Sequence, residues 1–401
     1  MKFCVEKRVS IFTPNNNIQT QIMPSNKTSQ ESPTHTWITV LSNNAPIFNS
    51  NILFDIKDNY LIHEIIINYN LGPISGYTGT ATNAPRLVPS FLFSTKSEIL
   101  CNGVNIDTLF STQNFINNQI FYDDQDRAFI NLAAGSYSNT LSRYTLGQTT
   151  SNYYAPLYCF VNQIGYMGLN SAHGLQIKLT LDSLTNLIEK STLTAVLPAV
   201  TINSVSLLLR VSKITPAFVA QKLEKLRIQP MMATFNSTVS QTNAIASGVS
   251  QSTILLSSFS NSNIQHFYFV FRPISTALTG DALFQFSNIV SNFYIIDGSG
   301  ANILNNPIPA SMNLLLINRA STLGTYTTET FGNMYAWYFT LDAVNTSENG
   351  KVNGSRFFNG NEALVINYTV NTLFNYQIDI YGSSTSVLNM NINECKKLAF
   401  V

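Results

Sequence analysis

The residues of this chain that could bind a metal ion or catalyse a reaction are few and scattered. The densest acidic group is the segment YDDQDR, which contains Asp123, Asp124 and Asp126. Carboxylates clustered on a loop suit Ca²⁺, a hard cation that prefers oxygen ligands. The segment lacks the glycine and the distal glutamate of an EF-hand loop, and Arg127 can pair with one of its carboxylates. We therefore expect a solvated loop, with these three aspartates as weak candidates for a metal site.

The four histidines and four cysteines form no recognisable ligand or catalytic motif. No two histidines have the HxxxH spacing, and no CxxC pair is present. Cys101 and Cys159 lie in apolar segments and are expected to be buried thiols, whereas a bridge between Cys4 and Cys395 has no support from spacing. The GxSxG motif is absent, and no helix or lysine follows the glycines of DGSGAN. The sequence predicts no cofactor and no catalytic residue.

The composition favours a folded protein that packs against copies of itself. Of 401 residues, 45% are hydrophobic and only 11% are charged, and the net charge is +1. A typical soluble domain has ~25% charged residues. Asn, Ser and Thr supply the polar surface instead, which suits extensive self-association or an extracellular β-protein. No basic face is indicated, so we expect no direct sequence-specific binding of nucleic acid.

No segment indicates export or membrane insertion. The N-terminus MKFCVEKRVSIFTPNNN lacks the apolar core of a signal peptide, and no apolar run reaches the ~18 residues that span a bilayer. Residues 1–34 are polar, so we expect an N-terminal arm. The scattered cysteines favour synthesis in a reducing compartment.

Most of the remaining chain has the alternation of apolar and polar residues that is typical of half-buried strands. Clear examples are HTWITVL, NILFDIKD, LQIKLTLDS and IQHFYFVFRP. In the last of these, Phe267, Phe269 and Phe271 share one face, and we expect them in the core of a β-sandwich. Asn102-Gly103 predicts a tight hairpin because both residues tolerate positive φ.

Three long polar segments are predicted to be loops, at residues 72–86, 110–154 and 231–251. The second contains a short helical pattern, TQNFINNQIFY. A weak internal similarity relates residues 93–106 to residues 286–303, because each has Phe-Ser, an apolar strand, a glycine turn and then Asn-Ile. Two related β-halves would result from a duplicated domain.

One clear helical pattern, TPAFVAQKLEKL, lies between these halves. Thr215 can cap its N-terminus, and Pro216 suits the first helical position. Lys222 and Lys225 are expected on the exposed side. The opposite side has an apolar stripe at helical spacing, formed by Val219, Leu223 and Leu226.

These patterns divide the chain into four segments and predict an all-β fold. Residues 1–34 would form the arm, 35–214 a first β-domain, 215–228 a connecting helix packed across the seam, and 229–401 a second β-domain. Each half has the length and the strand content of an eight-stranded antiparallel jelly roll, in which two sheets pack face to face.

Three passages resemble the double jelly-roll major capsid proteins of tailless icosahedral DNA viruses, the lineage that includes tectiviruses, adenoviruses and virophages. YYAPLYCFV followed by GLQIKLTLDS is similar to late strands of their first roll. VSLLLRVSKITPAFVAQKL resembles the final first-roll strand running into a connecting helix. FFNGNEALVINYTVNTLFNYQIDIYGSS resembles the closing strands of the second roll. The resemblance covers nearly the whole chain beyond the arm and rests on topology more than on individual letters.

This resemblance implies a structural, non-enzymatic protein of the virion capsid, made in the cytoplasm or nucleus of a host cell. It implies a homotrimer of pseudo-hexagonal outline, because three chains supply six rolls. Such trimers would tile an icosahedral shell together with neighbouring capsomers and minor or penton proteins. The arm would run beneath the shell toward neighbours or an internal membrane, and the long polar segments would form towers or clasps between subunits.

Two other classes of protein fit the same composition. A viral spike, fibre or lectin-like β-sandwich adhesin would bind glycans through loop aromatics, with Ca²⁺ at Asp123, Asp124 and Asp126. A β-rich polysaccharide hydrolase would need a pair of carboxylates, and the glutamates are too scattered to nominate one. The sequence favours the capsid hypothesis, which predicts stable self-association.

Overall fold

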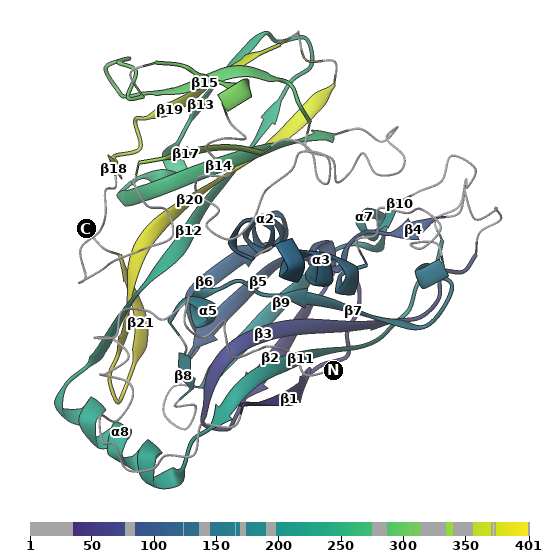
Figure 1. Ribbon diagram of the computed structural model, residues 1–401, viewed down its shortest axis with the longest axis vertical. Helices are drawn as coiled ribbons and strands as arrows, with labels where there is room; N and C mark the ends of the chain where they lie inside the picture. Colours follow the sequence, from purple (N-terminus) through teal and green to yellow (C-terminus); the bar gives the residue numbers. More distant parts are fainter. Residues whose placement is uncertain are drawn as a thin grey trace.

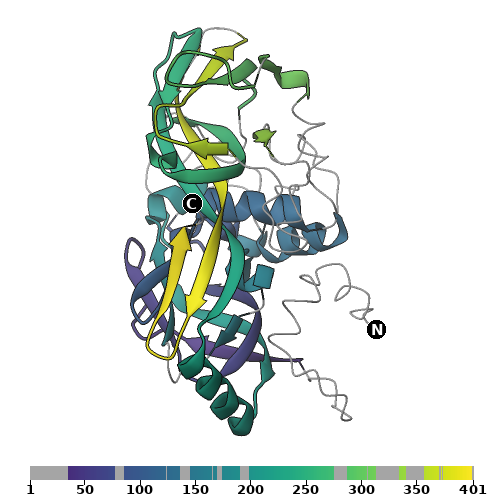
Figure 2. The same ribbon diagram turned by 90° about the vertical axis from the view of Figure 1, so that its left-hand side faces the viewer.

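The computed structural model describes residues 35–76, 85–122, 124–135, 145–164, 166–168, 174–189, 198–274, 287–304, 306–312, 334–339, 356–369, 372 and 374–399. Two β-rich halves follow one another along the chain, and the helix α8 (Pro216–Ile228) lies between them in sequence. Figure 1 and Figure 2 show an elongated molecule with the second half at one end and α8 at the other. None of the helices in the described part of the chain is both long and apolar enough to cross a bilayer.

The first half contains two antiparallel sheets and several short helices. Its strands are β1 His35–Leu41, β2 Asn51–Ile56, β3 Tyr60–Leu71, β4 Arg86–Leu87, β5 Ser94–Cys101, β6 Val104–Phe110, β7 Ser151–Pro156, β8 Tyr166–Gly168, β9 Leu175–Leu181, β10 Ile188–Glu189 and β11 Ile202–Lys213. Its helices are η1 Ser90–Leu92, α2 Ser111–Phe121, α3 Asp124–Ala133, α5 Phe160–Ile164 and α7 Leu184–Leu187. One sheet has the order β1-β11-β3-β7, with β8 beside β3, and the other has the order β2-β9-β5-β6. A separate short ladder pairs β4 with β10.

The second half repeats this plan, with longer first, third and last main strands. Its elements are β12 Met231–Ile245, β13 Gln251–Leu255, η2 Ser257–Phe259, β14 Ser262–Ile274, β15 Val290–Ile296, β16 Ile308–Pro309, β17 Met334–Tyr338, β18 Arg356–Phe358, β19 Ala363–Tyr368, β20 Asn375–Met390 and β21 Cys395–Ala399. One sheet has the order β12-β20-β14-β17, with β18 beside β14 and β21 beside β20. The other sheet has the order β13-β19-β15-β16.

The two halves have the same topology. When the eight main strands of each half are counted in chain order, both halves have one sheet ordered 1-8-3-6 and a second ordered 2-7-4-5. This arrangement of two facing sheets is the jelly roll, so the predicted fold class, two eight-stranded jelly rolls in tandem, is confirmed. The two sequence-similar passages both fall on the fourth strand, β5 in the first roll and β15 in the second, and on the turn that follows it.

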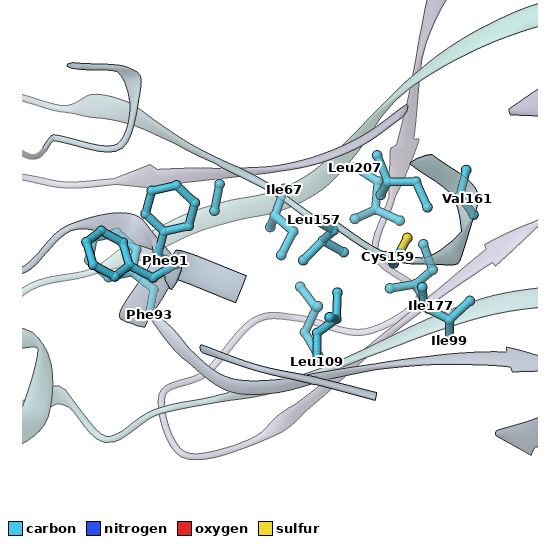
Figure 3. Packing of buried hydrophobic residues seen from close by; sticks show 14 of the residues in the cluster. Ile67, Phe91, Phe93, Ile99, Leu109, Leu157, Cys159, Val161, Ile177 and Leu207 are labelled. Carbon is cyan, nitrogen blue, oxygen red and sulfur yellow. The ribbon is translucent and has the colours of Figure 1, made fainter. Parts of the chain in front are cut away.

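The alternation of apolar residues explains how the first roll closes around a core. Ile67 of β3 and Leu207 of β11 lie on one sheet, and Ile99 of β5 and Ile177 of β9 lie on the other. Figure 3 shows these side chains facing one another, with Leu157 between them. Because side chains in a strand alternate between faces, each sheet buries one apolar face in this layer.

The predicted hairpin at Asn102-Gly103 is confirmed. It joins β5 to β6, and the two residues have φ of 50° and 75°. Both values lie in the left-handed region, as a two-residue type I′ turn requires.

Two of the predicted loops are wrong. Residues 231–245 form β12, whose fifteen residues all pair with β20 from Met231↔Met390 to Ile245↔Tyr376. Residues 110–154 contain α2, α3 and the start of β7, and α2 confirms the short helical pattern expected within this segment. In both segments, polar side chains such as Gln113, Asn114 and Ser237 are buried and bond to neighbouring elements, so polarity did not mean exposure. Of residues 72–86, the part 77–84 lies outside the described residues.

The passage predicted as one strand at residues 153–161 also differs. β7 ends at Pro156, and the chain then turns into the short helix α5. Proline supplies no N–H for a continuing ladder, which favours the end of the strand at this position.

Candidate functional site: the interface between the two rolls

The second roll is packed against the first through the outer face of the sheet β12-β20-β14-β17. On β14, Phe267, Phe269 and Phe271 point into the second sandwich, as predicted. Tyr268 and Val270 face the opposite way and belong to the same apolar cluster as the core of the first roll. The second-roll residues in that cluster are Phe235, Tyr268, Val270, Met334, Ala336, Tyr381, Leu388, Met390 and Cys395. The core of the first roll therefore extends across this inter-roll interface onto the second roll, whose own core lies on the other face of the same sheet.

Helix α2 supplies polar side chains to the first-roll side of the interface, and Figure 1 shows it between the two halves. Its buried polar residues are Thr112, Gln113, Asn114, Asn117, Asn118 and Gln119. A buried amide without a partner costs ~1–3 kcal/mol, so such a helix is stable only if its side chains find hydrogen bonds. Two of these bonds cross between the rolls: the Tyr268 hydroxyl donates to Asn117 Oδ1 at 2.9 Å, and Gln113 Nε2 donates to Thr238 Oγ1.

Other bonds fix α2 to its own roll. Asn114 Nδ2 donates to the carbonyl oxygen of Pro156 at 2.8 Å, and Asn118 Nδ2 donates to the same oxygen at 3.2 Å. The backbone N–H of Tyr158 donates to Asn114 Oδ1 at 2.9 Å. At the start of the helix, the side chain of Gln113 accepts a bond from the N–H of Phe110. The same residues thus anchor the helix and present it to the second roll.

A second contact joins α5 of the first roll to β12 of the second. The rings of Phe160 and Phe235 lie 5.4 Å apart between centroids, and both side chains are fully buried. The backbone N–H of Phe160 donates to Asp107 Oδ2 at 3.2 Å. Aromatic pairs in such tilted contact add ~0.5–1.5 kcal/mol to the burial of their surface.

A third contact is made by the C-terminal strand β21, which packs beside β6. Lys397 of β21 lies near Asp107 of β6, and its Nζ is 6.0 Å from the centroid of the Phe235 ring. Burial raises the pKa of Asp107 to about 6, although Lys397 and two backbone N–H groups act in the opposite direction. Burial lowers the pKa of Lys397. The pair is a partly desolvated charge contact between the rolls.

Two thiols meet at the same place. Cys101, at the end of β5, and Cys395, at the start of β21, lie close enough for the Cys101 thiol to act on that of Cys395, and both are buried. This contact, and burial, raise the pKa of Cys395 well above its usual range. Cys101 and Cys159 are buried as predicted. Cys4 lies outside the described residues, and the pairing of Cys395 with Cys101 was not foreseen because the two lie in different rolls.

The sheet β12-β20-β14-β17 of the second roll contains a buried carboxylate with several hydrogen-bond partners. Asp379 of β20 accepts bonds from Arg272 Nη2 at 2.6 Å, Thr242 Oγ1 at 2.9 Å and Gln377 Nε2 at 2.8 Å. These partners come from β14, β12 and β20, so the group ties three adjacent strands together. The buried carboxylate is therefore fully hydrogen-bonded, as buried polar groups in folded proteins generally are.

Comparisons with known proteins support the topology. No family model and no curated protein matches this sequence. Among solved structures, PBCV-1 VP54, fitted into a cryo-EM reconstruction of the virophage Sputnik, matches with a TM-score of 0.70 and 14% identity over 94% of this chain and 100% of that chain. The Faustovirus major capsid protein matches with a TM-score of 0.65 and 10% identity over 93% of each chain. The mavirus major capsid protein matches with a TM-score of 0.55 and 10% identity over 100% of this chain and 96% of that chain.

The chain has the fold of the double jelly-roll capsid proteins. The similarity extends through both rolls and includes their relative placement, since each match covers more than nine tenths of both chains. The resemblance seen in the sequence is thereby confirmed at the level of the fold.

In this double jelly roll, the predicted helix forms at one end of the molecule. α8 begins after Thr215, whose Oγ1 accepts the N–H of Phe218 at 3.3 Å, and Pro216 occupies its first turn. Its apolar residues form a small separate cluster: Val219 and Leu226 are buried there, packed by Leu61, Ile214, Phe218, Leu223 and Met231. Leu61 belongs to the first roll and Met231 to the second, so this cluster touches both. That α8 connects the two rolls and packs across the boundary between them stays a prediction. The large inter-roll interface is built by α2, α5 and β21 instead.

One lysine of α8 was placed wrongly. Lys225 is exposed as expected, but Lys222 is only 8% exposed. Its Nζ lies 5.3 Å from the centroid of the Phe218 ring. A lysine can cover apolar surface with its methylene stem while its ammonium group contacts an aromatic face.

The aspartates proposed as a calcium site do not form the expected loop. Asp124 and Asp126 lie in the first turn of α3, and Asp123 lies outside the described residues. Within the described ranges, no group of three His, Cys, Asp or Glu side chains could hold a metal ion.

Two histidines that appear isolated in the sequence meet in the fold. β1 and β3 flank β11, and this brings the rings of His35 and His63 to 4.7 Å. His63 Nε2 and His35 Nδ1 lie 2.9 Å and 3.2 Å from Ser212 Oγ. Burial, then His35 and Arg210, lower the pKa of His63 to about 4. The contact depends on strand pairing between residues far apart in the chain, and spacing alone does not reveal it.

Proposed function

We propose that this chain is a major capsid protein of an icosahedral DNA virus, and that it builds a protein shell rather than catalysing a reaction. The observation that carries the proposal is the presence of two rolls with the same strand order, fixed to one another by a buried interface. Solved capsid proteins share this fold over nearly the whole chain. Within it, residues 1–34 would be the arm, 35–214 and 229–401 the two rolls, and 215–228 their connector.

The geometry explains how such a chain could tile a surface. Three copies of a chain with two similar rolls present six similar units around one axis, so a homotrimer has a nearly hexagonal outline. A hexagonal outline allows trimers to contact neighbouring capsomers on all sides. The inter-roll interface would keep the two rolls of each copy at a fixed angle, which regular tiling requires.

The surface around β1 is suited to contact between copies. Trp37 and Leu41 are 52% and 70% exposed and lie on the same face of this strand, and Ile47 is exposed in the segment that follows. Among the described residues β1 pairs only with β11, so its other edge is open. Open strand edges and exposed apolar side chains favour association. The arm, residues 1–34, joins the chain at this strand and would reach neighbouring subunits or an internal membrane.

The mass and shape of the purified full-length chain in solution test this proposal. Light scattering after gel filtration should give the mass of three chains, and electron microscopy of stained particles should show pseudo-hexagonal outlines. A folded chain that stays monomeric at micromolar concentration would overturn the proposal.

A matched pair of variants tests the surface around β1. Trp37→Glu should weaken the trimer at least tenfold, because it places a charge in the proposed contact. Ile228→Glu, at an exposed apolar residue of α8, should leave the trimer unchanged. Equal behaviour of the two variants would remove β1 from the proposed interface.

A further inference from the structure

Four titratable side chains gather on the outer face of the first roll, beside the strand β1 at the edge of its sheet. His35, the first residue of β1, lies opposite Ser212 of β11. On the other side of β11, Glu64 of β3 lies opposite Arg210, whose Nε is 3.3 Å from Glu64 Oε2. His63 Nε2 and His35 Nδ1 lie 2.9 Å and 3.2 Å from Ser212 Oγ. The serine hydroxyl therefore bridges β1 and β3 across the strand between them.

A β-bulge in β3 places one of these two histidines. The ladder between β11 and β3 pairs Arg210 with Glu64 and Val211 with Ile62, which leaves His63 without an opposite residue. A bulge bends its strand and can re-aim a side chain. The ring of His63 is thereby brought edge to face with the ring of the first histidine of β1, at 4.7 Å between centroids. Protonation of both rings would place two positive charges at this distance.

The charge of this cluster rises in acid. At neutral pH both histidines are neutral, and the charges of Glu64 and Arg210 cancel. Burial raises the pKa of Glu64, whereas burial, then His35 and Arg210, lower the pKa of His63 to about 4. Glu64 therefore loses its charge before His63 gains one. Once both rings are protonated, they lie beside the guanidinium without a charged carboxylate to compensate them.

The titratable groups on the neighbouring elements do not offset this charge. β1 contains no titratable residue besides His35. Tyr122, which follows α2, stays neutral, because burial and then Glu64 raise its pKa well above the usual range. On β11, the exposed Lys213 adds a further positive charge. Asp58, in the turn before β3, accepts a hydrogen bond from the hydroxyl of Tyr60 at 3.0 Å.

We propose that His35, Ser212 and His63 form a latch that holds the edge strand β1 on its sheet at neutral pH and releases it in acid. β1 is suited to release because, among the described residues, it pairs with β11 alone. Local opening of a peripheral element costs less free energy than global unfolding, so the rest of the roll can stay folded. All these contacts lie within one chain, and the latch therefore does not depend on the capsid proposal.

The direction of the effect follows from the linkage between protonation and opening. A histidine whose pKa is lower in the closed state stabilises that state above its ordinary pKa of ~6.5, and this contribution is lost as the pH falls toward 4. If His63 regains its ordinary pKa on opening, a fall from pH 7.5 to pH 5 should increase the open population of β1 roughly tenfold or more. Glu64 acts in the opposite direction, because its raised pKa lets protonation favour the closed state. It titrates in the wild type and in histidine variants alike, so their comparison removes its contribution.

Hydrogen exchange of the full-length protein at pH 7.5 and pH 5, corrected for intrinsic exchange rates and followed by mass spectrometry, tests the latch. In the wild type, the protection of peptides that cover β1 should fall roughly tenfold or more between these pH values. His63→Gln keeps a polar side chain near Ser212 but gains no charge in acid, and it should reduce this fall to less than about threefold. His35→Gln, at an exposed residue, should reduce the fall as well.

The strand β12 is a matched control within the same molecule. It is the first strand of the second roll and lies at the edge of the equivalent sheet, and neither β12 nor its partner β20 contains a histidine. Its protection should change less than about threefold in the wild type, a comparison that holds even if a variant folds poorly. Equal losses in β1 and β12 would indicate general unfolding and overturn the proposal. The latch is also wrong if β1 is equally protected at both pH values, or if both variants lose as much protection as the wild type.

Discussion

The two rolls share one topology but use the same sheet in different ways. In the first roll, the sheet β1-β11-β3-β7 buries one face, and the other face carries partly exposed polar groups such as Asn68 and the pair Glu64–Arg210. In the second roll, the central strands β14 and β20 of the equivalent sheet β12-β20-β14-β17 are buried on both faces. A duplicated fold therefore preserves strand order, while the surroundings of each copy decide which faces become apolar.

The third strand of each roll shows this difference in the number of buried faces. β3 alternates between buried and partly exposed side chains along most of its length. β14 has eight consecutive buried residues, from Ile264 to Phe271. Five of them, Phe267 to Phe271, form a continuous apolar run, which is typical of a strand with two buried faces. Four predictions, in order of decreasing effect, test this contrast between the faces and between the rolls.

The largest effect is expected in the core of the second roll. Phe269 stacks on Tyr335 with centroids 5.2 Å apart and meets Phe293 at 5.1 Å. Phe269→Ala should lower the free energy of unfolding by ~3–5 kcal/mol, because it leaves a cavity in a closely packed layer. Chemical denaturation measures the change. Phe129→Ala, at an exposed phenylalanine of α3, is the control and should cost less than ~0.5 kcal/mol.

A smaller loss is expected at the opposite face of the same strand. Tyr268→Phe removes the hydroxyl that donates to Asn117 and should cost ~1–3 kcal/mol, since a buried amide oxygen loses its donor. Hydrogen exchange should show faster opening of α2 against the second roll. Tyr335→Phe, whose lost bond to Asn288 lies within the second roll, should leave α2 protected. Equal exchange in the two variants would contradict a separate role for the outer face.

The charge contact between the rolls predicts a dependence on pH. Because the pKa of Asp107 is raised to about 6 in the folded chain, the protonated form favours folding. This contribution is complete below the unfolded pKa of ~3.9 and is lost as the pH rises through 6. Between pH 5 and pH 7.5 the free energy of unfolding of the wild type should fall by ~1 kcal/mol relative to that of Asp107→Asn. The buried histidines titrate in both proteins and cancel in the difference, which denaturation at the two pH values gives directly.

The smallest effects should be equal in the two rolls. Gly103 and Gly300 lie in the turns that follow the fourth strand of each roll, with φ of 75° and 84°, and an added Cβ would meet no atom within 4 Å. Changing either glycine to Ala should therefore lower the free energy of unfolding by only ~1 kcal/mol, the cost of the strained backbone. Unequal losses would show that one turn makes contacts beyond its own hairpin.

Alternation in the sequence predicted most of the fold but little of the interface. Strands such as β9, the hairpin at Asn102-Gly103 and the inner face of β14 follow from local patterns. The run HFYFVF also contains the signal for the second buried face, since Tyr268 and Val270 interrupt the phenylalanines without a polar residue. The length of a strand and its apolar content, considered together with the alternation of its residues, could therefore have located the inter-roll interface.

The polar side of the interface could not have been found in this way. The residues of α2 and β12 are mostly Asn, Gln, Ser and Thr, which in isolation favour exposed loops. Their burial depends on partners such as Tyr268 and Pro156, which are distant in sequence. The pairings Cys101–Cys395 and His35–His63 depend likewise on strand order, which one sequence does not specify.

The uninterrupted ladder between β12 and β20 has a consequence for the shape of any assembly. One end of this ladder, at Phe235 and Leu388, belongs to the core that contains the first roll, and the other end, at Ile245 and Tyr376, belongs to the core of the second. The same hydrogen-bonded strands are thus part of both cores, so this ladder ties the two rolls together over the residues that it pairs. If copies of this chain tile a closed shell, the shell's curvature would then arise where one copy meets the next rather than between the two rolls of one copy.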